Sequence, residues 1–294
     1  MIRTLAFAVA LLLLAIPALW AAEGAILVTE DVQLRVADAF MQEHEYYRAI
    51  TEYKRFLILF PESSRGDYAL FQTGTAYFRG GDNDGAAKNF SALREKYPQS
   101  LFAGEACFLE AMSYWKKKEY EKSGNLFLEL VQAYPDVSRA PAAMAAAALT
   151  ELDRGNTEAA GALLHRFVAT YPDHPKIERV GEAISLLEGY ADLPQKSMML
   201  ASIMSAVLPG AGYAYAGDYG TAFMSFVVNG AFIAGAWTAF AQELYAVGAL
   251  VAGVGVPFYA GNIYGSALAV KKWNYAVKQE ARDRIYAALD FVFE

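Results

Sequence analysis

The feature that most constrains this chain is an aromatic residue followed by a proline, a pair that recurs at a fixed interval. Each proline lies 37 residues after the previous one, three times running. A fixed period of this length indicates a repeat architecture. Because proline lacks an amide hydrogen and disfavours helix in the residue before it, each pair is expected to end a helix. The pairs are Phe60-Pro61, Tyr97-Pro98, Tyr134-Pro135 and Tyr171-Pro172.

Other positions of the repeat hold either small or large side chains. Small residues stand 24 and 12 positions before each proline, and a large apolar residue stands 8 positions before it. A small residue lets two helices approach while a large one fills the space beside it, so the pattern predicts one helix pair per repeat and an all-α solenoid. The small residues are Ala37, Gly74, Ala111 and Ala148, with Ala49, Ala86, Ser123 and Ala160; the large ones are Tyr53, Phe90, Phe127 and Leu164.

Short polar segments separate the expected helices. Residues 80–85 and 153–156 contain glycine, asparagine and aspartate and are predicted to be the turns within two of the helix pairs. Serines also follow three of the prolines, at positions where helix N-caps are expected. They are Ser63, Ser64, Ser100 and Ser138.

This pattern resembles the tetratricopeptide repeat over residues 32–190, although the repeat here is about three residues longer than the usual 34. Longer repeats ending in Tyr-Pro or Phe-Pro are similar to those of Gram-negative envelope proteins, such as the cell-division coordinator and the outer-membrane-assembly lipoproteins. The resemblance implies a solenoid that binds protein partners. The fourth repeat departs from it at Glu151, and a partial fifth repeat from Asp173 is expected to act as a cap.

The resemblance also implies that the first helix of each repeat lines a partner-binding groove. Large apolar residues occupy these positions in two neighbouring repeats, and aromatic side chains make an attractive docking surface for a protein segment. The alternative is that the same residues pack on neighbouring repeats or on the C-terminal half of the chain. The candidate groove residues are Tyr68, Phe71, Phe78, Phe108, Met112 and Trp115.

Residues 1–22 have the layout of a secretory signal peptide, in which Arg3 precedes an apolar run and small residues gather near its end. An uncleaved N-terminal anchor is the alternative. No cysteine follows the run, which excludes a bacterial lipoprotein anchor, and the single Cys107 excludes an internal disulfide. We therefore expect an exported repeat domain over residues 23–191.

The C-terminal half differs sharply in charge. Residues 197–270 contain only two charged side chains, Asp218 and Glu243, which divide the segment into three stretches long enough to span a bilayer. Residues 192–270 are therefore predicted to form a membrane domain in contact with lipid, with two or three helical spans. Residues 271–294 are predicted to form an amphipathic helix.

Side-chain size and charge bear on how the membrane domain is arranged. Glycines and alanines recur at helical spacing in the second and third stretches, which permits a tight hairpin or a homo-oligomer. Three spans would place the C-terminal cluster around Lys271 and Lys272 in the cytoplasm, where the positive-inside rule favours it. Two spans would return the tail to the periplasm. Both arrangements remain open, with the charge bias favouring three.

A glycine-rich motif lies in the first uncharged stretch. It resembles the motif of small bacterial membrane modules, including the two-transmembrane-helix family, through Pro209, Gly210, Gly212, Tyr215 and Gly217. That resemblance implies a membrane-embedded module without an assigned catalytic activity or ligand. A phosphate-binding loop is a poorer interpretation, because the Lys-Ser/Thr ending and a preceding strand are both missing.

The sequence offers little support for catalysis. His44, His165 and His174 have no metal-ligand spacing, and no nucleophile motif is present. A net charge of −7 and a pI near 5.2 argue against nucleic-acid binding. We therefore expect neither enzyme activity, cofactor nor metal.

Taken together, these features predict a scaffold anchored in the bacterial inner membrane, with its repeats in the periplasm. The repeats would bind protein partners in cell-envelope assembly or cell division. The alternative is an accessory or pore-forming subunit of an oligomeric membrane transport complex, assembled through the glycine-rich hairpin.

Overall fold

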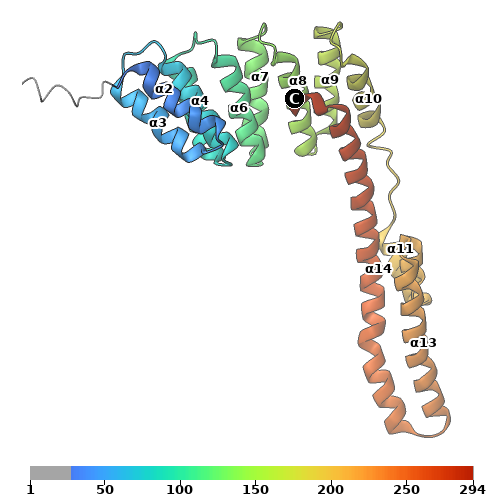
Figure 1. Ribbon diagram of the computed structural model, residues 1–294. Coiled ribbons are helices and arrows are strands. Elements are labelled where there is room, and N and C mark those ends of the chain that lie inside the picture. Colours follow the sequence, from blue (N-terminus) through green and yellow to red (C-terminus); the bar gives the residue numbers. More distant parts are fainter. Residues whose placement is uncertain (1–27, 294) are drawn as a thin grey trace, which may run out of the picture. The chain divides into compact units, whose positions relative to one another are not determined.

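The structure is a computed structural model that describes residues 28–293, so the predicted signal peptide lies outside the described residues. Every regular element among the described residues is a helix, which confirms the all-α class (Figure 1). The chain divides into two compact units, Met1–Thr150 and Glu151–Glu294. The predicted domain boundary at residue 191 falls inside the second unit.

The first unit is built from consecutive helix pairs, as expected for tetratricopeptide-like repeats. From α2 to α7, each helix packs on the next. The helices are α2 (Glu30–Gln42), α3 (Tyr46–Leu59), α4 (Gly66–Arg79), α5 (Asn83–Lys96), α6 (Ala103–Lys116) and α7 (Tyr120–Ala133), and α8 (Ala140–Asp153) runs across the division between the units.

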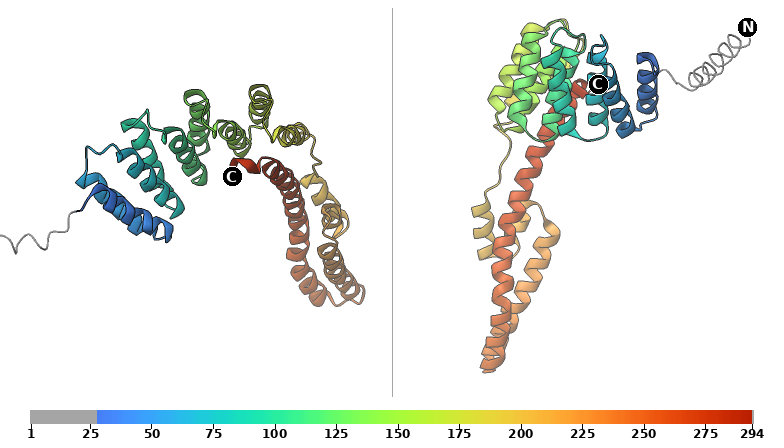
Figure 2. Two further views of the ribbon diagram at one scale, coloured as in Figure 1. Left: turned by 45° about the horizontal axis from the view of Figure 1, so that its top comes forward. Right: turned by 90° about the vertical axis from the view of Figure 1, so that its left-hand side faces the viewer.

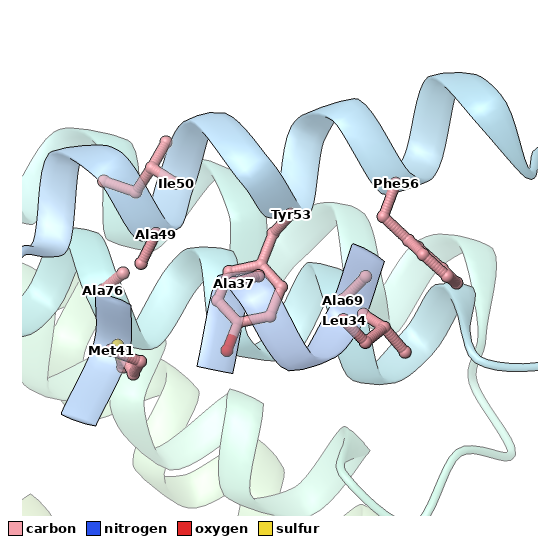
Figure 3. Packing of buried hydrophobic residues seen from close by; sticks show 9 residues of the cluster. All are labelled: Leu34, Ala37, Met41, Ala49, Ile50, Tyr53, Phe56, Ala69 and Ala76. Carbon is pink, nitrogen blue, oxygen red and sulfur yellow. The ribbon is translucent and has the colours of Figure 1, made fainter. Parts of the chain in front are cut away.

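The small and large positions of the repeat form the core. Ala37, Ala49 and Tyr53 are fully buried within the first helix pair, as Figure 3 shows. In the next pair, a Cβ atom on Gly74 would stand 2.7 Å from the ring of Phe90, which itself is completely buried. The absence of a side chain at Gly74 is therefore what lets α4 and α5 approach.

Each aromatic-proline pair ends a helix in the predicted way. The aromatic residue follows the last helical residue of α3, α5, α7 and α9, with φ between −125° and −131°. Its amide donates a last hydrogen bond of 2.7–2.9 Å to the carbonyl four residues earlier. The proline that follows has no N–H with which to continue the ladder.

The predicted turns are confirmed, and the predicted serine N-caps are wrong. Gly81 and Gly155 adopt positive φ between the paired helices, at +84° and +85°. Ser63 and Ser100 each accept the amide of the residue two positions later at 3.1 Å. They therefore order the turn that precedes the helix, and the N-cap positions of α4 and α6 are Arg65 and Phe102.

The second unit contains the remaining helices. Two of them, α13 and α14, are long and apolar enough to cross a membrane, and they lie side by side as a hairpin (Figures 1 and 2). The predicted boundary at residue 270 falls inside α14. The elements are α9 (Thr157–Thr170), α10 (Ile177–Glu188), α11 (Met198–Val207), α12 (Ala211–Ala216), α13 (Tyr219–Ala241), α14 (Tyr245–Ala288) and the 3₁₀ helix η1 (Asp290–Phe293).

The first uncharged stretch is not a single long helix. It is divided between α11, with 10 residues, and α12, with 6. A helix of 10 residues is about 15 Å long, half the hydrocarbon thickness of a bilayer. The three-span arrangement therefore lacks a third long helix among the described residues.

The Gly74 contact predicts the effect of a larger side chain there. Gly74→Val should lower the free energy of unfolding by about 1–3 kcal/mol, because the added atoms would overlap the buried Phe90 ring. Chemical denaturation of the full chain in detergent, followed by circular dichroism, measures the change.

Gly161→Val is the matched control, since a Cβ atom on this helical glycine would meet nothing within 4 Å. Equal stability of the two variants would contradict the close-approach explanation.

Candidate functional site

The six predicted groove residues lie on α4 and α6, but they are not equally accessible. Phe108 and Met112 are buried, and the Phe108 ring packs 5.4 Å from that of Phe127. Phe71 stacks on Phe102 with ring centroids 4.9 Å apart. Phe108 and Met112 therefore leave little surface for a partner, whereas Phe71 is partly exposed beside Phe102.

The other three groove residues are partly exposed. Tyr68 donates its hydroxyl to Asp38 at 2.8 Å, and burial together with this carboxylate raises the pKa of Tyr68. The Lys116 ammonium lies 3.9 Å from the centre of the Phe78 ring, and Trp115 follows on the same helix. A partner of the first unit could therefore contact Tyr68, Phe78 and Trp115.

Tyr68 also lines a polar hollow of about 560 Å³ between α2 and α4. Large apolar residues alone guided the groove prediction, which therefore missed the contribution of α2. The sequence of α2 did contain a signal for this surface, because Asp31, Arg35 and Asp38 have the i, i+4, i+7 spacing of one helix face. The residues lining the hollow are Asp31, Leu34, Arg35, Asp38, Arg65 and Tyr68.

The hollow carries charges of both signs. The Arg65 guanidinium donates to Asp31 at 2.7 Å and to Glu30 at 3.2 Å, and these bonds raise its pKa. Asp38 accepts the hydroxyls of both Tyr53, at 2.5 Å, and Tyr68. The surface is thus suited to a polar protein segment that can exchange hydrogen bonds with carboxylates and guanidinium groups.

The described residues offer neither a metal-binding group nor a reactive thiol. Among residues 28–293, no group of three or more histidine, cysteine or acidic side chains could hold a metal ion. Burial raises the pKa of the Cys107 thiol to about 12, so the nucleophilic thiolate does not form at neutral pH.

The glycine-rich motif builds a compact structure in the second unit, which we call the helical clasp: α11, α12 and the turn 208–210 between them. Gly210 has φ +88°, and a Cβ atom there would stand 2.1 Å from the carbonyl oxygen of Ala222. Its amide donates to the Asn262 side chain at 2.9 Å. Asn262 in turn donates to the Ser205 carbonyl at 3.0 Å, so one buried amide bridges both sides of the helix break.

The other motif glycines close the clasp. A Cβ atom on Gly212 would stand 2.1 Å from the Ala201 carbonyl oxygen, so α11 and α12 touch through their backbones. Ser266 on α14 donates to the same carbonyl at 3.2 Å. Gly217 ends α12 with φ +94°, and Pro209 is buried in the break.

Tyr215, the aromatic residue of the motif, lies where the clasp begins. Its hydroxyl accepts the Ser197 amide at 3.2 Å. Beside it, the Lys196 ammonium donates to the Ala216 carbonyl at 3.2 Å and lies 4.0 Å from the Trp273 ring centre. The motif thus folds α11 and α12 against α14, with its polar groups used in internal hydrogen bonds.

Sequence reasoning missed the residues of α14 that hold the clasp. Asn262, Ser266 and Asn274 are the partners, and each lies in or beside the long apolar stretch. Polar side chains in such a stretch are the signal that could have identified them, because a polar group buried among apolar residues needs a hydrogen-bond partner.

The clasp predicts a strong effect of Gly210→Ala. The substitution forces a left-handed backbone on an L residue and overlaps the Ala222 carbonyl, so we expect a loss of about 2–4 kcal/mol of stability. Thermal denaturation in detergent micelles measures it.

Gly220→Ala is the control, because that glycine of the same segment has open space around it and no positive φ. If Gly210→Ala were no more damaging than this control, the tight packing of the break would be refuted.

Comparison with known proteins supports the repeat assignment. The tetratricopeptide repeat family matches residues 68–100, which cover most of α4, all of α5 and the turn that follows. No curated protein matches the chain. Tetratricopeptide repeats are typically scaffolds that mediate protein–protein interactions and lack catalytic activity. Residues 68–100 thus match a tetratricopeptide repeat, within an all-α fold whose later part contains two long apolar helices.

Proposed function

We propose that this protein is a membrane-anchored scaffold whose repeats bind a protein partner in the periplasm of a Gram-negative bacterium. The observation that carries the proposal is the polar hollow between α2 and α4 on a tetratricopeptide-repeat unit. Envelope assembly or cell division is the setting that the resemblance of the repeats implies. The aromatic side chains of Tyr68, Phe78 and Trp115 would extend the contact surface.

Membrane anchoring is supported by the surface of the hairpin. Only 11% of the apolar window of α13 and 17% of that of α14 is buried. Trp237, Leu250 and Phe223 are 77%, 68% and 66% exposed. Apolar surface of this extent is unfavourable in water and is covered when a bilayer surrounds the hairpin.

For a chain that crosses the membrane twice, the predicted signal peptide and the positive-inside rule favour opposite orientations. The predicted signal peptide directs the repeats out of the cytoplasm, whereas the positive-inside rule favours the cytoplasm for Lys271 and Lys272. Long domains are translocated largely irrespective of their charge. We therefore give the export signal precedence, which yields the periplasmic, inner-membrane location.

In-cell photo-crosslinking tests the partner site. A photoactivatable amino acid in place of Arg35, which lines the hollow and is exposed, should yield one discrete protein adduct in the membrane fraction. The same amino acid in place of Leu101, 97% exposed in a turn, should not yield that adduct. Identical adduct patterns at both positions, or none at Arg35, would count against a partner site in the hollow.

A second candidate function is a subunit of an oligomeric membrane complex, and one observation favours it. Asn229, near the middle of α13, is 3% exposed, and its Oδ1 atom has no hydrogen-bond partner among the described residues. Its Nδ2 donates to the Ser225 carbonyl at 2.8 Å, which uses one of its two hydrogens. The bilayer midplane has no donors, and because this oxygen is buried, a donor from another helix reaches it only when the packing around Asn229 opens on association. A second copy carries the same amide at the same depth.

Small residues near Asn229 are consistent with this second candidate. A Cβ atom on Gly230 or Gly261 would meet nothing within 4 Å, so neither glycine is needed for packing inside the hairpin. Small residues at a helix surface permit close approach of another helix.

Sedimentation in detergent tests the oligomer. Asn229→Leu should weaken self-association by about 3- to 15-fold, in line with interhelical hydrogen bonds measured in membranes. Thr238→Val serves as the control, because that hydroxyl already donates to the Ala234 carbonyl of its own helix. A monomeric parent protein would eliminate this candidate.

A further inference from the structure

The C-terminal end of the chain is held on the last repeat helices by buried and charged side chains. Asp153, at the end of α8, has 2% of its side chain exposed and accepts hydrogen bonds from Tyr286, at 2.6 Å, and from Arg282. Arg179 on α10 donates to Asp290 at 2.6 Å and also to the Ala287 carbonyl. The bond from Arg179 lowers the pKa of Asp290.

Apolar contacts seal the same interface. Phe291 is 7% exposed, and its ring lies 6.1 Å from that of Phe167 and 5.4 Å from that of His174. Ile285, Leu289 and Val292 are almost completely buried. Residues 282–293, which we call the docked tail, therefore cover α9 and α10 as a capping helix would cover the end of a solenoid.

A second contact, outside the docked tail, brings α14 back to the start of the clasp. The Lys196 amide donates to the Asn274 side chain at 2.9 Å, and Asn274 donates to the Lys196 carbonyl at 2.9 Å. Lys196 lies only eight residues beyond the end of α10. The segment that leaves the repeats and the part of α14 that returns toward them therefore lie side by side at Lys196 and Asn274.

The length of α14 fits this arrangement. Its 44 residues extend over about 66 Å, of which a bilayer core takes about 30 Å. The uncharged part ends at Val270, and the following residues up to Ala288 include Lys271, Lys272, Arg282 and Arg284. Figure 1 shows α14 continuing from the hairpin to α10.

The geometry points to a membrane module that crosses the bilayer twice, with the docked tail on the repeat side. In this arrangement the clasp enters the membrane from the side of the repeats and returns to that side. Asn262 of α14 donates to the Ser205 carbonyl of α11, and Lys196 donates to the Ala216 carbonyl at the end of α12. The loop 242–244 is the segment exposed on the opposite side. This inference rests on the membrane anchoring proposed above and is independent of which compartment holds the repeats.

The docked tail also covers one surface of the repeats. The faces of α9 and α10 that Phe291 and Asp290 contact are filled by the chain itself, so a protein partner binds elsewhere on the repeats. Because the docked tail continues from α14, its contacts hold α14 on the last repeat helices. We call this attachment the lock.

Labelling of one introduced cysteine with a membrane-impermeant maleimide, in intact and in permeabilised cells, tests the topology. Cys107 is buried and gives little background. Lys88→Cys and Tyr275→Cys, both at exposed positions, should react from the same side, and Glu243→Cys from the other.

Each labelling result has a defined meaning. Reaction of Tyr275→Cys from the side opposite to Lys88→Cys would overturn the inference, as would reaction of all three variants from one side. If Lys88→Cys and Tyr275→Cys both react only after permeabilisation, while Glu243→Cys reacts in intact cells, the two-crossing inference stands and the periplasmic location fails.

Limited trypsin digestion of the full chain in detergent tests the lock. Phe291→Ala should speed cleavage after Arg282 and Arg284 by at least about tenfold, because a buried aromatic contact of the docked tail is lost. Phe291→Leu should give an intermediate rate. Tyr275→Ala, at a position of α14 that is 64% exposed, should leave the rate unchanged. Equal rates for Phe291→Ala and Tyr275→Ala would overturn the lock.

Discussion

Close approach of helices through a small residue facing an aromatic ring recurs in both units of this protein. In the repeats, Gly74 lies against Phe90, and Gly85 lies against Tyr77. In the hairpin, Gly248 lies against Phe240 and Gly255 against Phe232, at distances that leave no room for a side chain. The interaction is the same in both settings because it depends on the shape of the side chains and on dispersion forces between them.

The two settings differ in how polar groups are satisfied. Turns of the repeats face water, and serines such as Ser63 only order the chain before the next helix. The break between α11 and α12 has no such freedom, because Pro209 and Gly210 are buried and an unpaired buried backbone amide is expensive. Asn262 resolves this by accepting from Gly210 and donating to Ser205 across the break. The glycine motif and this asparagine therefore form one structural unit.

These constraints bear on the function proposed for the chain. The docked tail occupies α9 and α10, while the hollow between α2 and α4 remains open and charged. Partner recognition and membrane attachment are thus assigned to different repeats. A scaffold of this kind needs no catalytic group, and its action depends on which protein surface complements Asp31, Arg35 and Asp38.

The sequence by itself determined the repeat. The 37-residue period located the helix ends, and the small and large positions identified core residues such as Ala49 and Phe127, because helix termination and the spacing of small and large side chains are set by the order of residues along the chain. It also identified the apolar hairpin. Only the tertiary structure decided which aromatics remain accessible, since Phe108 is buried against Phe127 of a neighbouring helix while Tyr68 and Phe71 stay partly exposed. It alone paired Asp153 with Arg282 and Arg179 with Asp290, because residues more than 100 positions apart meet only when the whole unit has folded.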